Sequence, residues 1–222
     1  MRPYPARMPT LSAKFPNVAV YDHPLIQHKL SILRNRSTGH EQFRQLLNQI
    51  AGLMAFEVSR HLATREIEVE TPVARTKGTE LSEPTTIVPI LRAGLAMMDG
   101  FLALFPEAHV AHIGIYRDEK TAKPVTYYAK MPADIANGPA IVVDPMLATG
   151  GSAVHAVEIL RKKGVRSIQL VCLVAAPEGV AAMHAAHPDV PIHVASVDER
   201  LNERFYIVPG LGDAGDRIFG TA

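Results

Sequence analysis

The sequence predicts an α/β fold in which a parallel β-sheet is flanked by helices. The first observation is that short β-branched runs alternate with helical segments from residue 85 onward, a rhythm typical of parallel sheets covered on both faces. The second is that 47% of the 222 residues are apolar and 20% are charged, which suits one sizeable core. We therefore expect residues 17–222 to form a single domain.

The alternation assigns a range to each expected element. Strands are expected at 86–90, 110–116, 141–143, 168–174 and 192–197, and helices at 95–105, 153–163 and 180–187. In such sheets ligands bind where the strands end at their carboxyl edge. The segments that follow Ile90, Val143 and Val197 are therefore the places to look for chemistry.

The amino-terminal part carries mainly helical signals. Residues 1–16 are basic, lack acidic residues and contain four prolines, so a disordered tail is expected. Asp22 and Pro24 predict the start of a helix that ends near Arg36, and Thr38 with Glu41 forms a capping-box signature for a second helix. That second helix has an apolar stripe that would suit a core or an interface between subunits: Phe43, Leu46, Leu47, Ile50, Leu53, Met54 and Val58. Residues 66–83 are expected to be strand and loop.

Composition excludes several classes of protein. Lys and Arg number 23 against 22 Asp and Glu, so a net charge of +1 offers no general case for binding nucleic acid or a membrane surface. No run of about 18 apolar residues occurs, which argues against a membrane-spanning helix. The single cysteine, Cys172, lies in an apolar run and is expected to be a buried structural thiol in a reducing, cytoplasmic compartment.

The strongest local signal is a buried strand that runs through Asp144 into a loop rich in glycine and hydroxyl groups and then into a helix. Free N–H groups at a helix start, glycines that allow close approach, and the hydroxyls of Thr149 and Ser152 form a cradle for a phosphate. Asp144 is placed to accept hydrogen bonds from the two hydroxyls of a sugar. The alternative is a purely structural role, in which the segment is an ordinary strand-loop-helix connection with Ser152 as the N-cap.

This segment, DPMLATGGS, resembles the phosphoribosyl-diphosphate (PRPP) loop of type I phosphoribosyltransferases, and its variant is similar to that of the uracil enzymes. The common loop has two adjacent acidic residues and ends in Thr, whereas here Pro145 holds the second acidic place and Ser152 the last. Two further segments match the family's diphosphate contacts: the PILRAG turn with Arg92, and the loop after Tyr116, with Arg117, that closes over PRPP. Taken alone, these would suggest an arginine in a surface ion pair and a solvated hairpin.

The resemblance assigns roles to residues of this sequence. PRPP contacts are implied for Arg92, Arg117, Asp144, Pro145, Met146, Leu147, Ala148, Thr149, Gly150, Gly151, Ser152 and Asp213. Ile207, Gly212, Asp213 and Ala214 would bind uracil, and Arg117 and Asp213 hold the catalytic positions. No residue is assigned as general base. The family's usual Gly before the Tyr of the uracil segment is here Phe205, and its Tyr before the helix glutamate is Phe56.

The expected base specificity has a chemical reason. Uracil presents acceptors at O2 and O4 and a donor at N3, so exposed backbone N–H and C=O groups of a glycine-rich segment can pair with it. Cytosine would leave two polar groups mismatched, at a cost of about 1–3 kcal/mol for each buried one.

The implied reaction converts uracil and PRPP to UMP and diphosphate. PRPP would carry Mg²⁺, with Asp213 as an additional contact and no cage of protein side chains. Oxygen ligands suit that ion. The resemblance also implies a homodimer or homotetramer, with GTP as a candidate activator.

Three rival interpretations remain open from the sequence. Histidine pairs such as His184 with His187 and His109 with His112 could hold a metal, but no third ligand of fixed spacing accompanies them. A regulator that keeps this fold and binds RNA would need the two-acid loop and a basic face. A purine or orotate phosphoribosyltransferase would differ in the carboxy-terminal base segment.

Overall fold

The computed structural model describes residues 10–11, 15–117 and 124–221. Its helices are α1 (Pro24–Arg34), α2 (His40–Val58), α3 (Leu95–Leu102), α4 (Gly151–Lys162), α5 (Pro177–Ala186) and α6 (Ala214–Phe219). Its strands are β1 (Thr10–Leu11), β2 (Val18–Val20), β3 (Thr64–Glu70), β4 (Arg75–Leu81), β5 (Thr86–Leu91), β6 (His109–Val110), β7 (His112–Arg117), β8 (Pro124–Lys130), β9 (Ala140–Val143), β10 (Met146–Leu147), β11 (Ile168–Ala175), β12 (Ile192–Val197), β13 (Arg200–Leu201) and β14 (Ile207–Val208). Short 3₁₀ turns occur at Ser59–His61 and Ile135–Asn137.

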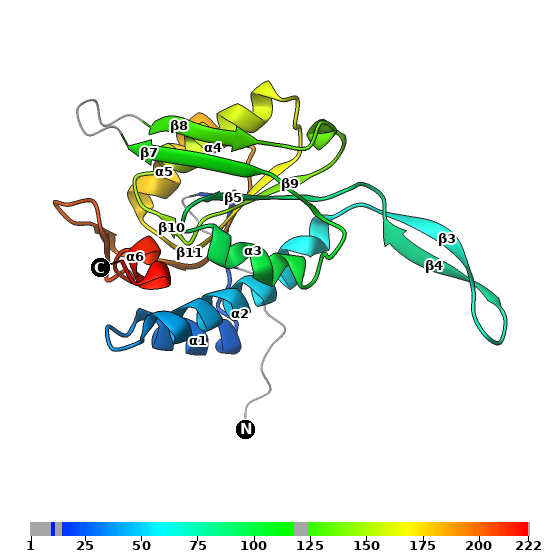
Figure 1. Cartoon of the computed structure of the whole chain (residues 1–222), viewed down its shortest axis with the longest axis horizontal. Coiled ribbons are helices and arrows are strands. Elements are labelled where there is room, and N and C mark those ends of the chain that lie inside the picture. Colours follow the sequence, from blue (N-terminus) through cyan, green and yellow to red (C-terminus); the bar gives the residue numbers. More distant parts are fainter. Residues whose placement is uncertain (1–9, 12–14, 118–123, 222) are drawn as a thin grey trace.

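A mostly parallel sheet forms the centre of the molecule, as predicted. Its strand order is β1-β2-β12-β11-β9-β5-β7-β8, with antiparallel pairing at β1-β2 and at β7-β8. Helices α4 and α5 cover one face, and α1, α2 and α3 cover the other (Figure 1). Thr10–Leu11, which fall in the expected tail, pair with β2, whereas residues 1–9 and 12–14 of that tail lie outside the described residues.

Successive strand residues contribute to opposite cores because side chains alternate across a sheet. In β5, Ile87 packs with α2 and α3, while its neighbour Val88 packs with α4 and α5. The predicted stripe of α2 is confirmed as core: Phe43, Leu47, Ile50, Met54 and Val58 are fully buried. The stripe is therefore not available as an interface between subunits.

The expected capping box is wrong. Helix α2 begins after Gly39 without a side-chain cap, and the Thr38 hydroxyl donates instead to the carbonyl of Ile32 at 2.6 Å. Thr38 thus ties the α1–α2 turn to the end of α1. Residues 66–83, expected as strand and loop, belong largely to two paired strands, β3 and β4, which form a hairpin that projects from the body (Figure 1, right).

Candidate active site

Strands β5 and β9 are parallel neighbours, with Pro89 opposite Val143. The turns that follow them therefore open at the same edge of the sheet, which is the edge where ligands were expected. Gly94 makes this closeness possible, because a Cβ at that position would overlap the carbonyl oxygen of Val143. The PILRAG turn and the PRPP-like loop are thus held against each other by backbone packing.

The segment predicted to form a phosphate cradle folds as a strand, a tight loop and a helix start. Gly150 precedes α4 at φ +84°, a left-handed conformation that favours glycine, and no side chain caps the helix. Gly150 rather than Ser152 is therefore the N-cap, so the alternative in which Ser152 caps the helix is wrong. A hollow of about 90 Å³ opens here and is lined by Asp144, residues 146–153 and Cys172. The first N–H groups of α4 form the positive end of the helix dipole, an arrangement that favours binding of an anion.

Cys172 lies on β11 and is fully buried, as expected for a structural thiol. Burial, with a smaller contribution from the nearby Asp144 carboxylate, raises the pKa of the Cys172 thiol well above its ordinary value. The thiol is therefore protonated and unreactive at neutral pH, even though it forms part of the wall of the hollow.

Asp144 stands at the end of β9, and its Oδ1 accepts a hydrogen bond from the Met146 N–H at 3.3 Å. Burial raises the pKa of Asp144 to about 7; the Met146 hydrogen bond opposes this rise and the negative charge of Asp213 adds to it. The effect of Asp213 on this pKa shows that the two carboxyl groups, which lie far apart in the sequence, are close enough in the fold to interact. The site thus has a concentration of negative charge that a cation or sugar hydroxyls would relieve.

Arg92 is exposed on the turn after β5. Its guanidinium lies 5.4 Å from the centre of the Phe219 ring on α6, and its Nη2 is 4.0 Å from the position that a Cβ on Gly215 would take. Arg92 therefore faces the same opening as the start of α6. Arg92 thus brings a positive charge to the carboxyl edge of the sheet, and a guanidinium suits a diphosphate.

The carboxy-terminal segment presents backbone between two buried anchors. Ile207 and Ala214 are buried, whereas Gly212 and Asp213 between them are exposed, and Gly212 has φ +81°. Asp213 caps α6 by accepting from the Asp216 N–H at 2.9 Å. Gly212 and Asp213 are thus exposed between two buried residues, and their binding of a base stays a prediction.

Phe205, which stands where the family usually has glycine, has φ +63°. A left-handed conformation costs an L-residue with a side chain about 1 kcal/mol or more. The sequence departure therefore coincides with backbone that suits glycine. The strain of the left-handed conformation therefore falls on Phe205.

Arg117 ends β7, and its backbone is paired with Pro124. Because β7 runs parallel to β5, with Leu91 opposite Gly114, Arg117 lies further along the same direction as Arg92. Residues 118–123 of the expected closing loop lie outside the described residues.

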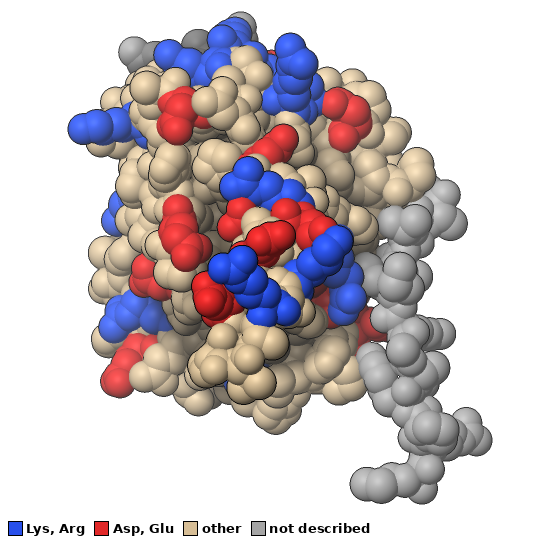
Figure 2. All heavy atoms as spheres, turned by 90° about the vertical axis from the view of Figure 1, so that its right-hand side faces the viewer, with Lys and Arg blue, Asp and Glu red and all other residues tan. Residues whose placement is uncertain are grey.

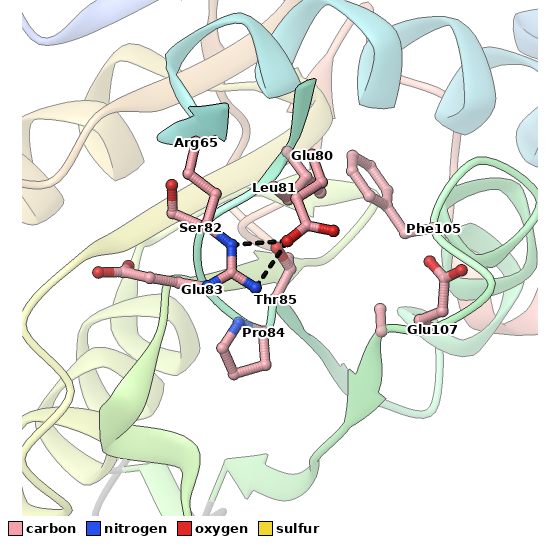
Figure 3. A pocket seen from close by; sticks show the side chains of 10 residues that line it. Arg65, Glu80, Leu81, Ser82, Glu83, Pro84, Thr85, Phe105 and Glu107 are labelled. Atoms are coloured by element: carbon pink, nitrogen blue, oxygen red, sulfur yellow. Dashed lines mark hydrogen bonds and ion pairs between the residues drawn. The ribbon is translucent and has the colours of Figure 1, made fainter. Parts of the chain in front are cut away.

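The largest hollow among the described pockets, about 450 Å³, lies elsewhere, at the root of the β3-β4 hairpin (Figure 3). There Arg65 is paired with Glu80 at 2.6 Å, and Phe105 and Glu107 line the opposite side. None of the predicted site residues lines it. The smaller hollow, in contrast, is lined by Asp144 and by the loop residues 146–152 that the sequence singled out.

Sequence reasoning missed Gly179 on α5. A Cβ there would lie 2.6 Å from the carbonyl oxygen of Leu147 and would overlap that of Ala148. The helix can therefore approach the PRPP-like loop only with glycine at this position. A lone glycine in a helical pattern was the available signal.

The histidine pairs have ordinary partners. His184 Nδ1 lies 2.9 Å from Asn17 Oδ1, and His187 Nε2 lies 3.3 Å from the carbonyl oxygen of Val154. His109 Nδ1 lies 3.6 Å from a carboxylate oxygen of Asp134. Within the described ranges, no group of three or more His, Cys, Asp and Glu side chains could hold a metal ion.

Comparison with known proteins decides the family. A family profile described as uracil phosphoribosyltransferase matches residues 20–221. The chain belongs to this family. Uracil phosphoribosyltransferases of Geobacillus kaustophilus and of a Thermoanaerobacter species are 56% and 60% identical to it, over 92% and 93% of this chain and 98% and 99% of theirs.

Solved structures share the fold of this chain. The AQ2163 protein from Aquifex aeolicus superimposes with a TM-score of 0.88 at 36% identity, covering 92% of this chain and 99% of that one. Adenine phosphoribosyltransferase from Trypanosoma brucei reaches 0.59 at 13% identity, covering 93% and 92%, which shows a shared fold alone. The predicted fold class and the predicted phosphoribosyltransferase activity are confirmed: the chain is an enzyme of the uracil phosphoribosyltransferase family, a glycosyltransferase.

Proposed function

We propose that this enzyme joins uracil to PRPP at the carboxyl edge of β5, β9 and β12, giving UMP and diphosphate. The observation that carries the proposal is the convergence of three segments there. Two relations between distant parts of the sequence support it: the Arg92 guanidinium lies beside the Phe219 ring and Gly215, and the charge of Asp213 acts on Asp144, which lines the hollow at the Gly150 loop.

The PRPP half of the site would consist of an anion cradle and a sugar contact. The first N–H groups of α4, with the hydroxyls of Thr149 and Ser152, would hold the 5-phosphate, and the Asp144 carboxylate would accept from the ribose hydroxyls. Arg92 and Arg117 would stabilise the diphosphate as it leaves. The remaining loop residues, Pro145, Met146, Leu147, Ala148, Gly150 and Gly151, would shape the cradle through their backbone.

The uracil half would read the base through backbone. Gly212 and Ala214 would pair with the polar edge of uracil, Ile207 would supply an apolar contact, and Asp213 would lie between base and ribose. Asp213 and Arg117 are the residues proposed to act at the reacting centre. Binding both substrates in line supplies much of the acceleration for a displacement at the anomeric carbon.

Magnesium fits this arrangement as an ion carried by the substrate. Asp144 and Asp213 raise the local negative charge, and carboxylate oxygens are the ligands that Mg²⁺ prefers, but two carboxylates do not form a complete cage. Bound with PRPP, the ion would neutralise charge on the diphosphate. Asp213 is the protein residue proposed to contact it.

We also propose that the enzyme is a homo-oligomer, with the β3-β4 hairpin in its interface. The hairpin stands away from the body, and Val73 near its tip is 93% exposed. Figure 2 shows Lys and Arg mixed with Asp and Glu on the face from which it projects, a pattern better suited to a complementary protein surface than to RNA. On the hairpin, opposite charges form the ion pairs Arg65–Glu80 and Lys77–Glu66.

The described residues include no helix long and apolar enough to cross a membrane. We propose a cytoplasmic location, supported by the buried, unpaired thiol of the single cysteine, which suits a reducing compartment.

The test is product formation, followed by chromatography, with PRPP and Mg²⁺ and with uracil, cytosine, hypoxanthine, adenine or orotate offered separately. We expect UMP from uracil alone, no product in EDTA, and a Gly212→Ala variant with a KM for uracil raised about tenfold. An arm with GTP tests activation. Product from a purine, or an unchanged KM in Gly212→Ala, would refute the assignment of the base segment.

A further inference from the structure

A base read by backbone needs that backbone to be held still. Between Ile207 and Asp213 the chain offers only Val208, Pro209, Gly210, Leu211 and Gly212, so no polar side chain of the segment itself fixes its conformation. Freezing one residue's backbone costs about 1–2 kcal/mol, and glycine has the most freedom to lose. The segment therefore depends on contacts from outside it.

The structure supplies those contacts at Gly210. Its N–H donates to Asp198 Oδ2 at 2.8 Å, and its carbonyl oxygen accepts from Arg34 Nη1 at 2.7 Å. Arg34 and Asp198 are joined to each other by two hydrogen bonds of 2.7 Å. A single ion pair thus binds both polar groups of one residue.

The ion pair is well shielded and its carboxylate is fully engaged. The Asp198 side chain is 2% exposed and that of Arg34 is 21% exposed. Oδ1 of Asp198 also accepts from the Ser196 hydroxyl at 2.7 Å. Burial alone would raise the pKa of Asp198, but hydrogen bonds from Arg34, Ser196 and Gly210 together lower it below its ordinary value, so the carboxylate stays charged.

The next residue along the segment is held in the same manner from another helix. Arg217 Nη1 on α6 donates to the carbonyl oxygen of Leu211 at 2.8 Å, and the guanidinium lies 4.4 Å from the centre of the Phe43 ring. Its Nη2 donates to the carbonyl oxygen of Asn35 at 2.6 Å. Gly210 is therefore held at both of its polar groups and Leu211 at its carbonyl, immediately before the exposed Gly212.

We infer that Arg34 and Asp198 are positioning residues for the base: their ion pair holds Gly210 so that the backbone of Gly212 is presented to uracil. The inference rests on the proposed assignment of uracil to the segment from Ile207 to Ala214. Within the described residues, the side chains of Arg34 and Asp198 form no hydrogen bond or ion pair with the proposed PRPP contacts. They should therefore affect the base and not PRPP.

Asp198→Asn is the deciding variant. It keeps the shape of the side chain but replaces one carboxylate oxygen by an NH₂ group, which faces donors in either orientation. The Oδ1 position receives Arg34 and Ser196, and the Oδ2 position receives Arg34 and Gly210. We expect the KM for uracil to rise about tenfold or more, while the KM for PRPP stays within about twofold.

Arg34→Lys is the second variant. A lysine keeps the charge but lacks the planar fork that reaches two carboxylate oxygens and the Gly210 carbonyl together. We expect its KM for uracil to lie between those of the unmodified enzyme and of Arg34→Ala. This graded rescue would not arise if Arg34 only supplied charge to the fold. If Asp198→Asn does not fold, Arg34→Lys decides the question.

Asp189→Asn is the matched control, because Asp189 is also paired with an arginine, Arg161, at a place remote from the base segment. It should leave both KM values unchanged. A folded Asp198→Asn with an unchanged KM for uracil, or with both KM values raised alike, would overturn the inference. If Gly212→Ala raises the KM for uracil and Asp198→Asn does not, positioning by the ion pair fails alone; if neither does, the base assignment fails.

Discussion

Asp144 has a carboxyl group whose pKa differs strongly from its value in water. Burial and the charge of Asp213 raise its pKa from 3.8 to about 7, so the folded protein without substrate prefers the protonated carboxyl. A raised carboxyl pKa means that stability falls as pH increases from about 4 to about 7 and then stays lower. Binding of the sugar hydroxyls favours the ionised form of Asp144, because a carboxylate accepts their hydrogen bonds.

Asp144→Asn should therefore stabilise the free enzyme at alkaline pH and weaken its use of PRPP. We expect the Tm of the variant to exceed that of the unmodified enzyme by about 10 °C at pH 8, with the difference vanishing near pH 4. Melting curves across this range, with and without PRPP and Mg²⁺, measure both effects. A difference in Tm that does not vary with pH would contradict the shifted pKa.

Phe205 allows a second test at the scale of one residue. Its φ of +63° suits glycine, so Phe205→Gly should be more stable than Phe205→Ala by about 1 kcal/mol, although both lose the same aromatic ring. Comparing the two variants with each other cancels the loss of side-chain contacts. Urea unfolding measures the difference, and equal stabilities would show that the backbone relaxes at this position.

At the scale of elements, α5 supports the PRPP-like loop from beneath. Gly179 touches the Leu147 and Ala148 carbonyl groups, and a Cβ on Gly150 would lie 2.9 Å from both the Gly179 carbonyl oxygen and the Ala182 Cβ. Gly179→Ala should push the loop outward and raise the KM for PRPP by tenfold or more, with a smaller change for uracil. Gly39→Ala, where a Cβ meets nothing within 4 Å, is the control for adding a methyl group. Equal effects of the two variants on the KM for PRPP would refute the supporting role of α5.

Elements with a strong period could be predicted, while those that depend on distant partners could not. The burial of α2, β5, β9 and β11 was predicted correctly, because the spacing of apolar residues within each element is enough to indicate it. The cradle at Gly150 was visible because its glycines are local. Thr38 has an alternative acceptor at Ile32, and Gly179 and Arg34 derive their roles from segments that only folding brings near. Asp198 had a signal, since it directly follows Val197 at the carboxyl edge.

At the scale of the molecule, a buried polar chain crosses the sheet on the side of β2. The Tyr21 hydroxyl lies 2.8 Å from His193 Nδ1, and His193 Nε2 lies 2.9 Å from Gln169 Oε1. A neutral imidazole with its proton on Nε2 satisfies both bonds, since it donates to Gln169 and accepts from Tyr21. Tyr21 directly follows β2, and the other two residues lie on β12 and β11, so the end of β2 is joined to these strands by side chains as well as by backbone hydrogen bonds.

This row of hydrogen bonds from Tyr21 through His193 to Gln169 should make the stability of the whole fold sensitive to acid. Burial, with a smaller contribution from His61, lowers the pKa of His193 from 6.5 to about 4. Stability from the neutral ring is therefore fully present above pH 6.5 and is lost as pH falls toward 4, amounting to about 3 kcal/mol over that interval. His193→Gln should lose stability at pH 7 but show a shallower decline on acidification, measured by urea unfolding from pH 7 to 4.5. The exposed His28, replaced by Gln, should leave the decline unchanged, and an unaltered slope in His193→Gln would place the acid sensitivity in other groups.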